Sequence, residues 1–198
     1  MDDIRPIPRN PPGSLLREPA GTLEEMHEDR RYRFRPGTLF IETHPCAFLC
    51  QGNRGILFFN DKNHFLNSTL KSFCREQIID FLNEKGIALF DTASSIRRLQ
   101  DNASDKFLEV VEATDVAALL RQLPECKAIV TTGQKATDTL RQQFEIEEPK
   151  VGDYSEFVFE GRAMRLYRMP SSSRAYPLAL DKKAAAYRIM FQDLQILR

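Results

Sequence analysis

The chain has 198 residues, of which 42% are hydrophobic, and its 28 basic residues balance 28 acidic ones. This length and apolar content are sufficient for one substantial hydrophobic core, so we expect one α/β domain. A net charge of zero excludes the global positive field of an abundant non-specific DNA-binding protein, although it allows a local basic face.

The cysteines and the hydropathy pattern indicate a cytoplasmic protein. Cys46 and Cys50 form one close pair, whereas Cys74 and Cys126 stand alone, so the two close pairs of a typical zinc site are missing. We therefore expect reduced thiols and no metal. No signal-peptide core and no apolar run long enough to cross a bilayer is present, which predicts a soluble, intracellular protein.

Residues 1–38 differ in composition from the rest of the chain. Prolines in Arg5–Gly13 disfavour helices and central strands, and the following residues are rich in charge. We expect a poorly ordered arm. The four arginines within Arg30–Arg35 alternate with aromatic residues and could bind a phosphate backbone, or the arm could be a solvated tail.

From residue 39 to 198 the pattern alternates between strand and helix. The predicted elements, in chain order, are helix Phe73–Lys85 ending at Gly86, strand Ile87–Phe90, helix Ala113–Leu123 capped by Thr114, strand Lys127–Thr131, helix Gln134–Phe144, a hairpin of Phe157–Phe159 and Met164–Met169, and helix Leu178–Phe191. This order predicts a parallel sheet with helices on both faces.

Ligands of such sheets bind beyond the carboxyl ends of the strands. Three predicted loops meet there: Asp91–Arg98, Thr131–Lys135 and Pro170–Tyr176. The last has the sequence Pro170-Ser-Ser-Ser-Arg-Ala-Tyr176, in which backbone N–H groups and hydroxyls suit a phosphate. The alternative is that Ser173 or a neighbour simply caps the following helix.

Five segments together resemble the uracil-DNA glycosylase superfamily, closest to its mismatch-specific and hypoxanthine-excising branches. They are His44-Pro45 at the approach to the first strand, Asn63-His64-Phe65, Ile87–Asp91 running into Arg97, Arg98 and Asn102–Asp105, Ile129–Ala136, and Pro170–Ala175. The resemblance covers roughly residues 40–195. It implies a three-layer α/β/α sandwich around a central, mainly parallel four-stranded sheet.

The resemblance also implies a function, in which the protein flips a damaged or mismatched base out of duplex DNA and hydrolyses its N-glycosidic bond as a monomer without a cofactor. The implied catalytic residues are Asp91, Asp61 and Asn60, and the implied base pocket comprises Phe90, Asn63, His64 and Thr132. The implied DNA contacts are Pro170, Ser171, Ser172, Ser173, Arg174, Arg97, Arg98, Ser104 and Lys135. Two of these residues have simpler interpretations, Asp91 as a cap or turn residue and His64 as a structural histidine.

The chain departs from the family in two places. Thr132 stands where asparagine is common in the mismatch branch, so the choice of base does not transfer. The apolar first strand with its following Gly–polar–Pro loop is not recognisable. Either Gly55-Ile-Leu-Phe-Phe59 substitutes for that strand and brings Asn60 and Asp61 to the catalytic edge, or the central strand is lost.

Two functions therefore remain open, an active DNA glycosylase and an impaired relative that binds DNA or a free base. A strand between those at Ile87 and Ile129 favours activity. A nucleotide-binding α/β protein is disfavoured, because the chain has no Gly-x-Gly-x-x-Gly turn and no Walker lysine pattern.

Overall fold

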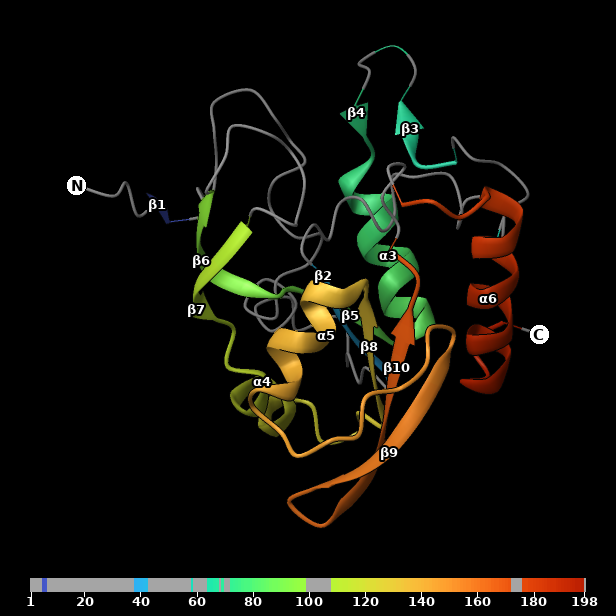
Figure 1. The fold of residues 1–198 in the computed structure, drawn as a ribbon. Coiled ribbons are helices and arrows are strands. Elements are labelled where there is room, and N and C mark those ends of the chain that lie inside the picture. The colour runs from blue at the N-terminus through green and yellow to red at the C-terminus, as the bar shows by residue number, and fades with distance from the viewer. Residues whose placement is uncertain are drawn as a thin grey trace.

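The computed structural model describes residues 5–6, 38–42, 58, 64–67, 69, 72–98, 108–171 and 176–197. Its main sheet has five strands in the order β5-β2-β8-β10-β9. Their bounds are Ile87–Asp91 for β5, Thr38–Glu42 for β2, Ala128–Thr132 for β8, Arg162–Met169 for β10 and Asp153–Phe159 for β9. The first four run parallel and β9 runs antiparallel at one edge, so the sheet has one strand more than the predicted four (Figure 1).

The central strand is the main correction to the sequence analysis. Strand β2, Thr38–Glu42, lies between β5 and β8 and pairs in parallel with both of them. The strand is therefore not lost, and Gly55–Phe59 does not take its place in the sheet. Only three apolar residues, Leu39–Ile41, form the interior of β2, and they directly follow a charged segment that the sequence analysis assigned to an arm.

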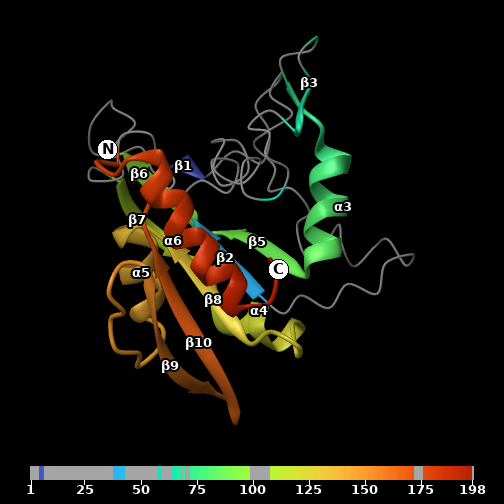
Figure 2. The same ribbon diagram turned by 90° about the vertical axis from the view of Figure 1, so that its right-hand side faces the viewer.

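Helices cover both faces of the main sheet. On one face, α3 (Arg75–Lys85) and α6 (Leu180–Asp193) pack with sheet residues such as Leu89 and Val130 in a first core cluster. On the other face, α4 (Val116–Gln122) and α5 (Gln134–Arg141) pack with residues such as Ile129 in a second core cluster. Figure 2 shows α6 lying in front of the strands and running in nearly the same direction as β10. The structure is thus a mixed α/β fold with helices on both sides of the sheet.

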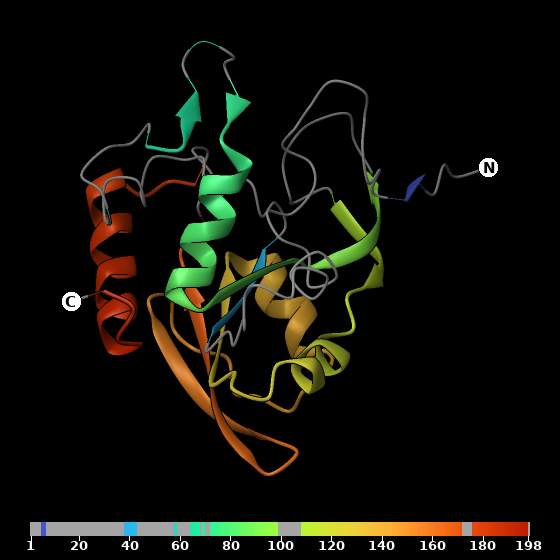
Figure 3. The same cartoon turned by 180° about the vertical axis from the view of Figure 1, so that it is seen from behind.

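A second, antiparallel sheet follows β5 directly. Strand β6 (Ala93–Arg98) pairs with β7 (Leu108–Ala113), and β1 (Arg5–Pro6) pairs with the other edge of β6. The prediction of a loop over Asp91–Arg98 is therefore wrong. Hydrogen bonds to β7 make most of this polar stretch a strand. Figure 3 shows this sheet beside the main one, with α3 in front of the strands.

Two further observations concern the N-terminal region and a short hairpin. Strand β2 begins at Thr38, one residue before the predicted domain start, and the division into arm and domain stays a prediction. The two-residue strands β3 (Leu66–Asn67) and β4 (Ser72–Phe73) pair just before α3. No helix in the described part of the chain is long and apolar enough to cross a bilayer.

Local capping differs from two predictions. Asp115, not Thr114, caps α4, and its carboxylate accepts a hydrogen bond from the amide of Ala118 (2.8 Å). The N-cap of α6 is Ala179, which has no side chain able to cap, so the interpretation of Ser173 as the cap of that helix is wrong. Gly86 ends α3 as predicted, in the left-handed conformation (φ 64°).

Candidate functional site at the carboxyl edge of the sheet

The carboxyl ends of the four parallel strands meet at one edge, which we call the carboxyl edge. Asp91 ends β5, Glu42 ends β2, Thr132 ends β8, and Pro170-Ser171 follow β10. The register pairs Glu42 with Asp91 and Thr132 with Met169. Neighbouring parallel strands lie about 4.8 Å apart, so these residues form one continuous row.

Strand alternation separates two residues of the predicted base pocket. Phe90 packs against the second core cluster, on the side of α4 and α5. Thr132 follows Val130 by two positions and therefore lies on the opposite face, with α3 and α6. Asp91 shares that face, because it follows Leu89 by two positions. The structure therefore brings Asp91 and Thr132 to one face and places Phe90 on the other.

The turn after β8 lies directly against the segment after β10. The amide of Gly133 donates to the carbonyl of Met169 (3.0 Å). Gly133 has φ 85° and ψ 171°, and a Cβ added to it would lie 3.3 Å from the Cβ of Ser171. Only glycine adopts this backbone conformation readily, and here it also allows the close approach. Two of the predicted loops therefore do converge at the carboxyl edge.

The buried hydroxyls of two threonines lie beside this turn and hydrogen-bond to its backbone and to β10. The hydroxyl oxygens of Thr131 and Thr137 lie 2.8 Å apart, and the carbonyls of Tyr167 and Gly133 lie 3.2 Å and 2.9 Å from them respectively. One hydroxyl donates its proton to the other. The accepting hydroxyl then donates its own proton to a backbone carbonyl. Thr131 and Thr137 are both fully buried, so these bonds connect β8 to the first turns of α5 without exposure to water.

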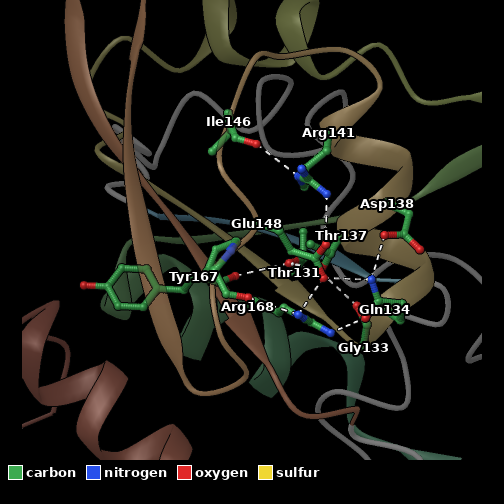
Figure 4. A network of polar contacts seen from close by, with 11 residues as sticks. Thr131, Gly133, Gln134, Thr137, Asp138, Arg141, Ile146, Glu148, Tyr167 and Arg168 are labelled. Carbon is green, nitrogen blue, oxygen red and sulfur yellow. Dashed lines mark hydrogen bonds and ion pairs between the residues drawn. The ribbon is translucent and has the colours of Figure 1, made fainter.

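A charged network surrounds the same turn (Figure 4). Arg168 on β10 donates to Glu148 (2.6 Å), to the carbonyl of Pro149 (3.0 Å) and to the side-chain oxygen of Gln134. Glu148 also accepts from Gln134 (3.1 Å) and from Arg141 (3.0 Å). The hydrogen bond from Gln134, aided by both arginines, holds the pKa of Glu148 below its usual value. The network fixes the start of α5 to β10.

Threonines connect the end of β5 to the second sheet. The hydroxyl of Thr114 donates to the carbonyl of Asp91 (2.7 Å), and its amide donates to the carbonyl of Thr92 (3.1 Å). The hydroxyl of Thr92 itself is buried and has no hydrogen-bond partner in the described part of the structure. Buried polar groups are rarely left unpaired, so the hydroxyl of Thr92 is an unusual feature at the end of β5.

The predicted DNA contacts occupy varied settings. Arg97 lies on β6 and pairs with Glu109 across the antiparallel sheet (3.1 Å), and Arg98 ends that strand. Lys135 lies in the first turn of α5 and is partly exposed. Pro170 is buried, and Ser171 is half-buried against Gly133. One guanidinium nitrogen of Arg97 is therefore held by Glu109, while its buried Nε has no hydrogen-bond partner in the described part of the structure.

The segment preceding β3 contributes both core and surface. Phe65 is buried in the first core cluster, and the ring of exposed His64 stands edge-on to it with centroids 4.9 Å apart. Phe58 packs against Phe81 and Phe191 of the same cluster. The following predicted site residues lie outside the described part of the structure: Asn60, Asp61, Asn63, Ser104, Ser172, Ser173 and Arg174.

Sequence reasoning missed two residues near this edge. Glu42 is in register with Asp91, and the apolar triplet before it was the signal for its strand. Lys183 lies on the buried face of α6 and is only 3% exposed. Its spacing of four, seven and eight residues from Tyr187, Met190 and Phe191 is the helical period that places a residue inside.

Among the described residues, no group of three or more histidine, cysteine or acidic side chains could hold a metal ion, and neither Cys74 nor Cys126 forms a disulfide bond there. No protein-family model matches the chain, and no curated protein matches it. Among solved structures, the chain is similar to the solution NMR structure of a candidate uracil DNA glycosylase from Methanosarcina acetivorans, with a TM-score of 0.47 and 14% sequence identity. The match covers 83% of this chain and 94% of that one.

Proposed function

We propose that this chain is a DNA glycosylase of base-excision repair. It would flip a uracil-, hypoxanthine- or thymine-type base out of damaged or mismatched duplex DNA and hydrolyse its N-glycosidic bond. The observation that carries the proposal is the complete central sheet, in which β2 pairs with both β5 and β8. The five sequence segments that resemble the uracil-DNA glycosylase superfamily support it independently.

The carboxyl edge has groups suited to this chemistry. Breaking an N-glycosidic bond develops positive charge on the sugar and negative charge on the departing base, and fixed dipoles and charges can stabilise both. Asp91 and Glu42 are acidic residues at paired positions of neighbouring strands. One carboxylate can orient water while the other stabilises the charged sugar.

The alternative is an impaired relative that binds DNA or a free base without excising it. Loss of the central strand would have favoured this alternative, because the two flanking strands would then carry unpaired backbone groups. Strand β2 fills that position, which favours hydrolysis. We propose further that the protein acts as a cytoplasmic monomer and needs neither a metal nor a cofactor.

A strand-cleavage assay tests the proposal. Labelled duplexes carrying uracil, hypoxanthine or a mismatched thymine are incubated with the protein, and hot alkali then cleaves any abasic site. We expect cleavage of at least one duplex above an undamaged control. No cleavage of any duplex by folded protein would refute the enzyme and favour the binding alternative.

Substitutions locate the activity at the carboxyl edge. We expect Asp91→Asn and Glu42→Gln each to lower the rate by about 10²–10⁴, the usual contribution of an acid–base group. The matched control is Glu84→Gln, which also removes a carboxylate but lies in the last turn of α3, directly before the amino end of β5. Equal rates for all three variants would exclude the two edge residues from the chemistry.

A further inference from the structure

A glutamine side chain joins the two helices that cover one face of the main sheet. Gln143 lies just beyond the end of α5, and its side-chain oxygen accepts a hydrogen bond from the amide of Val116 (3.1 Å), the first residue of α4. Its side-chain nitrogen donates to the carbonyl of Thr114 (2.9 Å). Only one orientation of a carboxamide satisfies a donor and an acceptor in this way. Gln143 therefore fixes the backbone on both sides of Asp115, the N-cap of α4.

Thr114 carries the same path of hydrogen bonds to the end of β5. It is 6% exposed and connects β7 to the N-cap of α4. Its hydroxyl donates to the carbonyl of Asp91 (2.7 Å), and its amide donates to the carbonyl of Thr92 (3.1 Å). Because its own carbonyl accepts from Gln143, each polar group of Thr114 takes part in the path. An unbroken series of hydrogen bonds therefore leads from the end of α5 to Asp91.

The two bonds that Thr114 donates act where the pairing of β5 with β2 stops. Glu42 and Asp91 are the last residues in register, and the chain then passes through Thr92 into β6. The carbonyls of Asp91 and Thr92 belong to two successive peptide planes, each of which is rigid. Holding both planes limits ψ of Asp91, and the rotamers open to a side chain depend on its backbone torsions. Thr114 thus restrains the direction of the Asp91 side chain through its backbone.

The hydroxyl of Thr114 has a role that packing alone does not supply. A buried hydroxyl loses its hydration and must regain a partner inside the protein, which here is the carbonyl of Asp91. Valine has nearly the same shape as threonine and suits the end of a strand equally well, yet it would leave this carbonyl without that donor. The hydroxyl therefore serves the end of β5.

We propose that Thr114 and Gln143 are positioning residues that hold the end of β5, so that the carboxylate of Asp91 has one fixed direction before DNA binds. The inference rests on the proposed function, in which Asp91 acts on the substrate. Displacing a group by about 1 Å at a reacting centre can cost about a hundredfold in rate. Loss of the restraint should therefore lower the rate of base excision and leave the affinity for DNA unchanged.

Nuclear magnetic resonance tests the restraint without reference to any activity. Three-bond couplings from the backbone nitrogen and carbonyl carbon of Asp91 to its Cγ measure whether the side chain occupies one rotamer. We expect one rotamer in the wild type and averaging over several in Thr114→Val and in Gln143→Leu. Thr114→Ser keeps the hydroxyl and should keep the single rotamer. Unchanged couplings in either Thr114→Val or Gln143→Leu would overturn the proposal.

Matched variants separate the restraint from a general loss of stability. Thr139→Val removes a hydroxyl from a buried threonine of α5, and Gln142→Leu alters an exposed glutamine directly before the path, so both should leave the couplings of Asp91 unchanged. Exchange of the amide of Val130, in the core of the sheet, should stay as slow in the two test variants as in the wild type. Averaged couplings in the controls, or fast exchange at Val130, would show a loosened fold and overturn the proposal.

Kinetics then test the part that depends on the proposed function. On a duplex that the wild type cleaves, we expect the single-turnover rate to fall about tenfold or more in Thr114→Val and Gln143→Leu, which corresponds to roughly one hydrogen bond. Binding to the same duplex with a stable abasic-site analogue should stay unchanged, and Thr114→Ser should restore the rate. Equal losses of rate and affinity, or a Thr114→Ser variant as slow as Thr114→Val, would overturn the role in excision. If the wild type cleaves no duplex, the proposed function fails, and the couplings of Asp91 still decide whether the restraint exists.

Discussion

Replacing Gly133 by alanine is the sharpest test of how the two loops of the carboxyl edge fit together. The backbone of Gly133, at φ 85° and ψ 171°, lies in a region that is essentially restricted to glycine, and forcing another residue into it costs about 1–3 kcal/mol. The new Cβ would also lie 3.3 Å from the Cβ of Ser171, so that neighbour must move by a few tenths of an ångström. Together these effects should lower the free energy of unfolding by about 3 kcal/mol.

For a chain of this length, that loss corresponds to a fall in Tm of about 6–12 °C, which differential scanning calorimetry resolves. Gly152→Ala and Gly161→Ala are matched controls, since both glycines have positive φ but neither would place a Cβ within 4 Å of another residue's atoms. They should cost only the backbone strain, about 1–2 kcal/mol. If Gly133→Ala lowers Tm no more than these controls, the turn is not packed against Ser171 as described.

Two further predictions concern pH. Burial and a hydrogen bond to Asp193 raise the pKa of Tyr167 from 10 to about 12, so its contribution to stability is fully present below pH 10 and lost as the pH rises towards 12. The free energy of unfolding, measured with urea between pH 8 and 12, should fall with pH in the wild type and fall less in Tyr167→Phe. An equal fall with pH in both proteins would contradict this prediction. The lowered pKa of Glu148 has the opposite effect, because stability from its bonds to Gln134 and Arg168 is present above the usual carboxyl pKa and lost in acid. In urea unfolding extended to acid pH, the free energy of unfolding should therefore fall less steeply with decreasing pH in Glu148→Gln than in the wild type. An equal fall in both proteins would show that the network contributes nothing.

The elements that sequence analysis located well are those whose pattern is complete within the segment itself. Helix α3 has a periodic apolar face and a glycine at its end, and both lie where they were predicted. The hairpin of β9 and β10 was signalled by apolar runs flanking Glu160-Gly161, and the two turn residues have the positive φ that such turns need. Local chemistry determined these elements, so the sequence was sufficient to predict them.

The elements that it missed depend on partners distant in sequence. Strand β6, Ala93–Arg98, is polar and short, and it becomes a strand because β7 and β1 supply hydrogen bonds on both of its edges. Strand β2 is five residues long and is stabilised by pairing with β5 and β8, whose paired residues lie 49 and 90 positions further along the chain. In both strands, pairing with distant strands produces no periodic pattern of apolar residues within the strand itself.

The misplaced central strand bears directly on the candidate site. The alternative in which Gly55–Phe59 replaced that strand directed attention to Asn60 and Asp61 as the residues that follow it. With β2 ending at Glu42, the acidic residue next to Asp91 is instead Glu42, which sequence reasoning did not single out. Because a strand of a parallel sheet presents its functional residues at its carboxyl end, identifying the central strand determines which side chains can act. The pairing of Glu42 with Asp91 therefore makes these two residues, from strands that are adjacent in space but distant in sequence, the pair to substitute first.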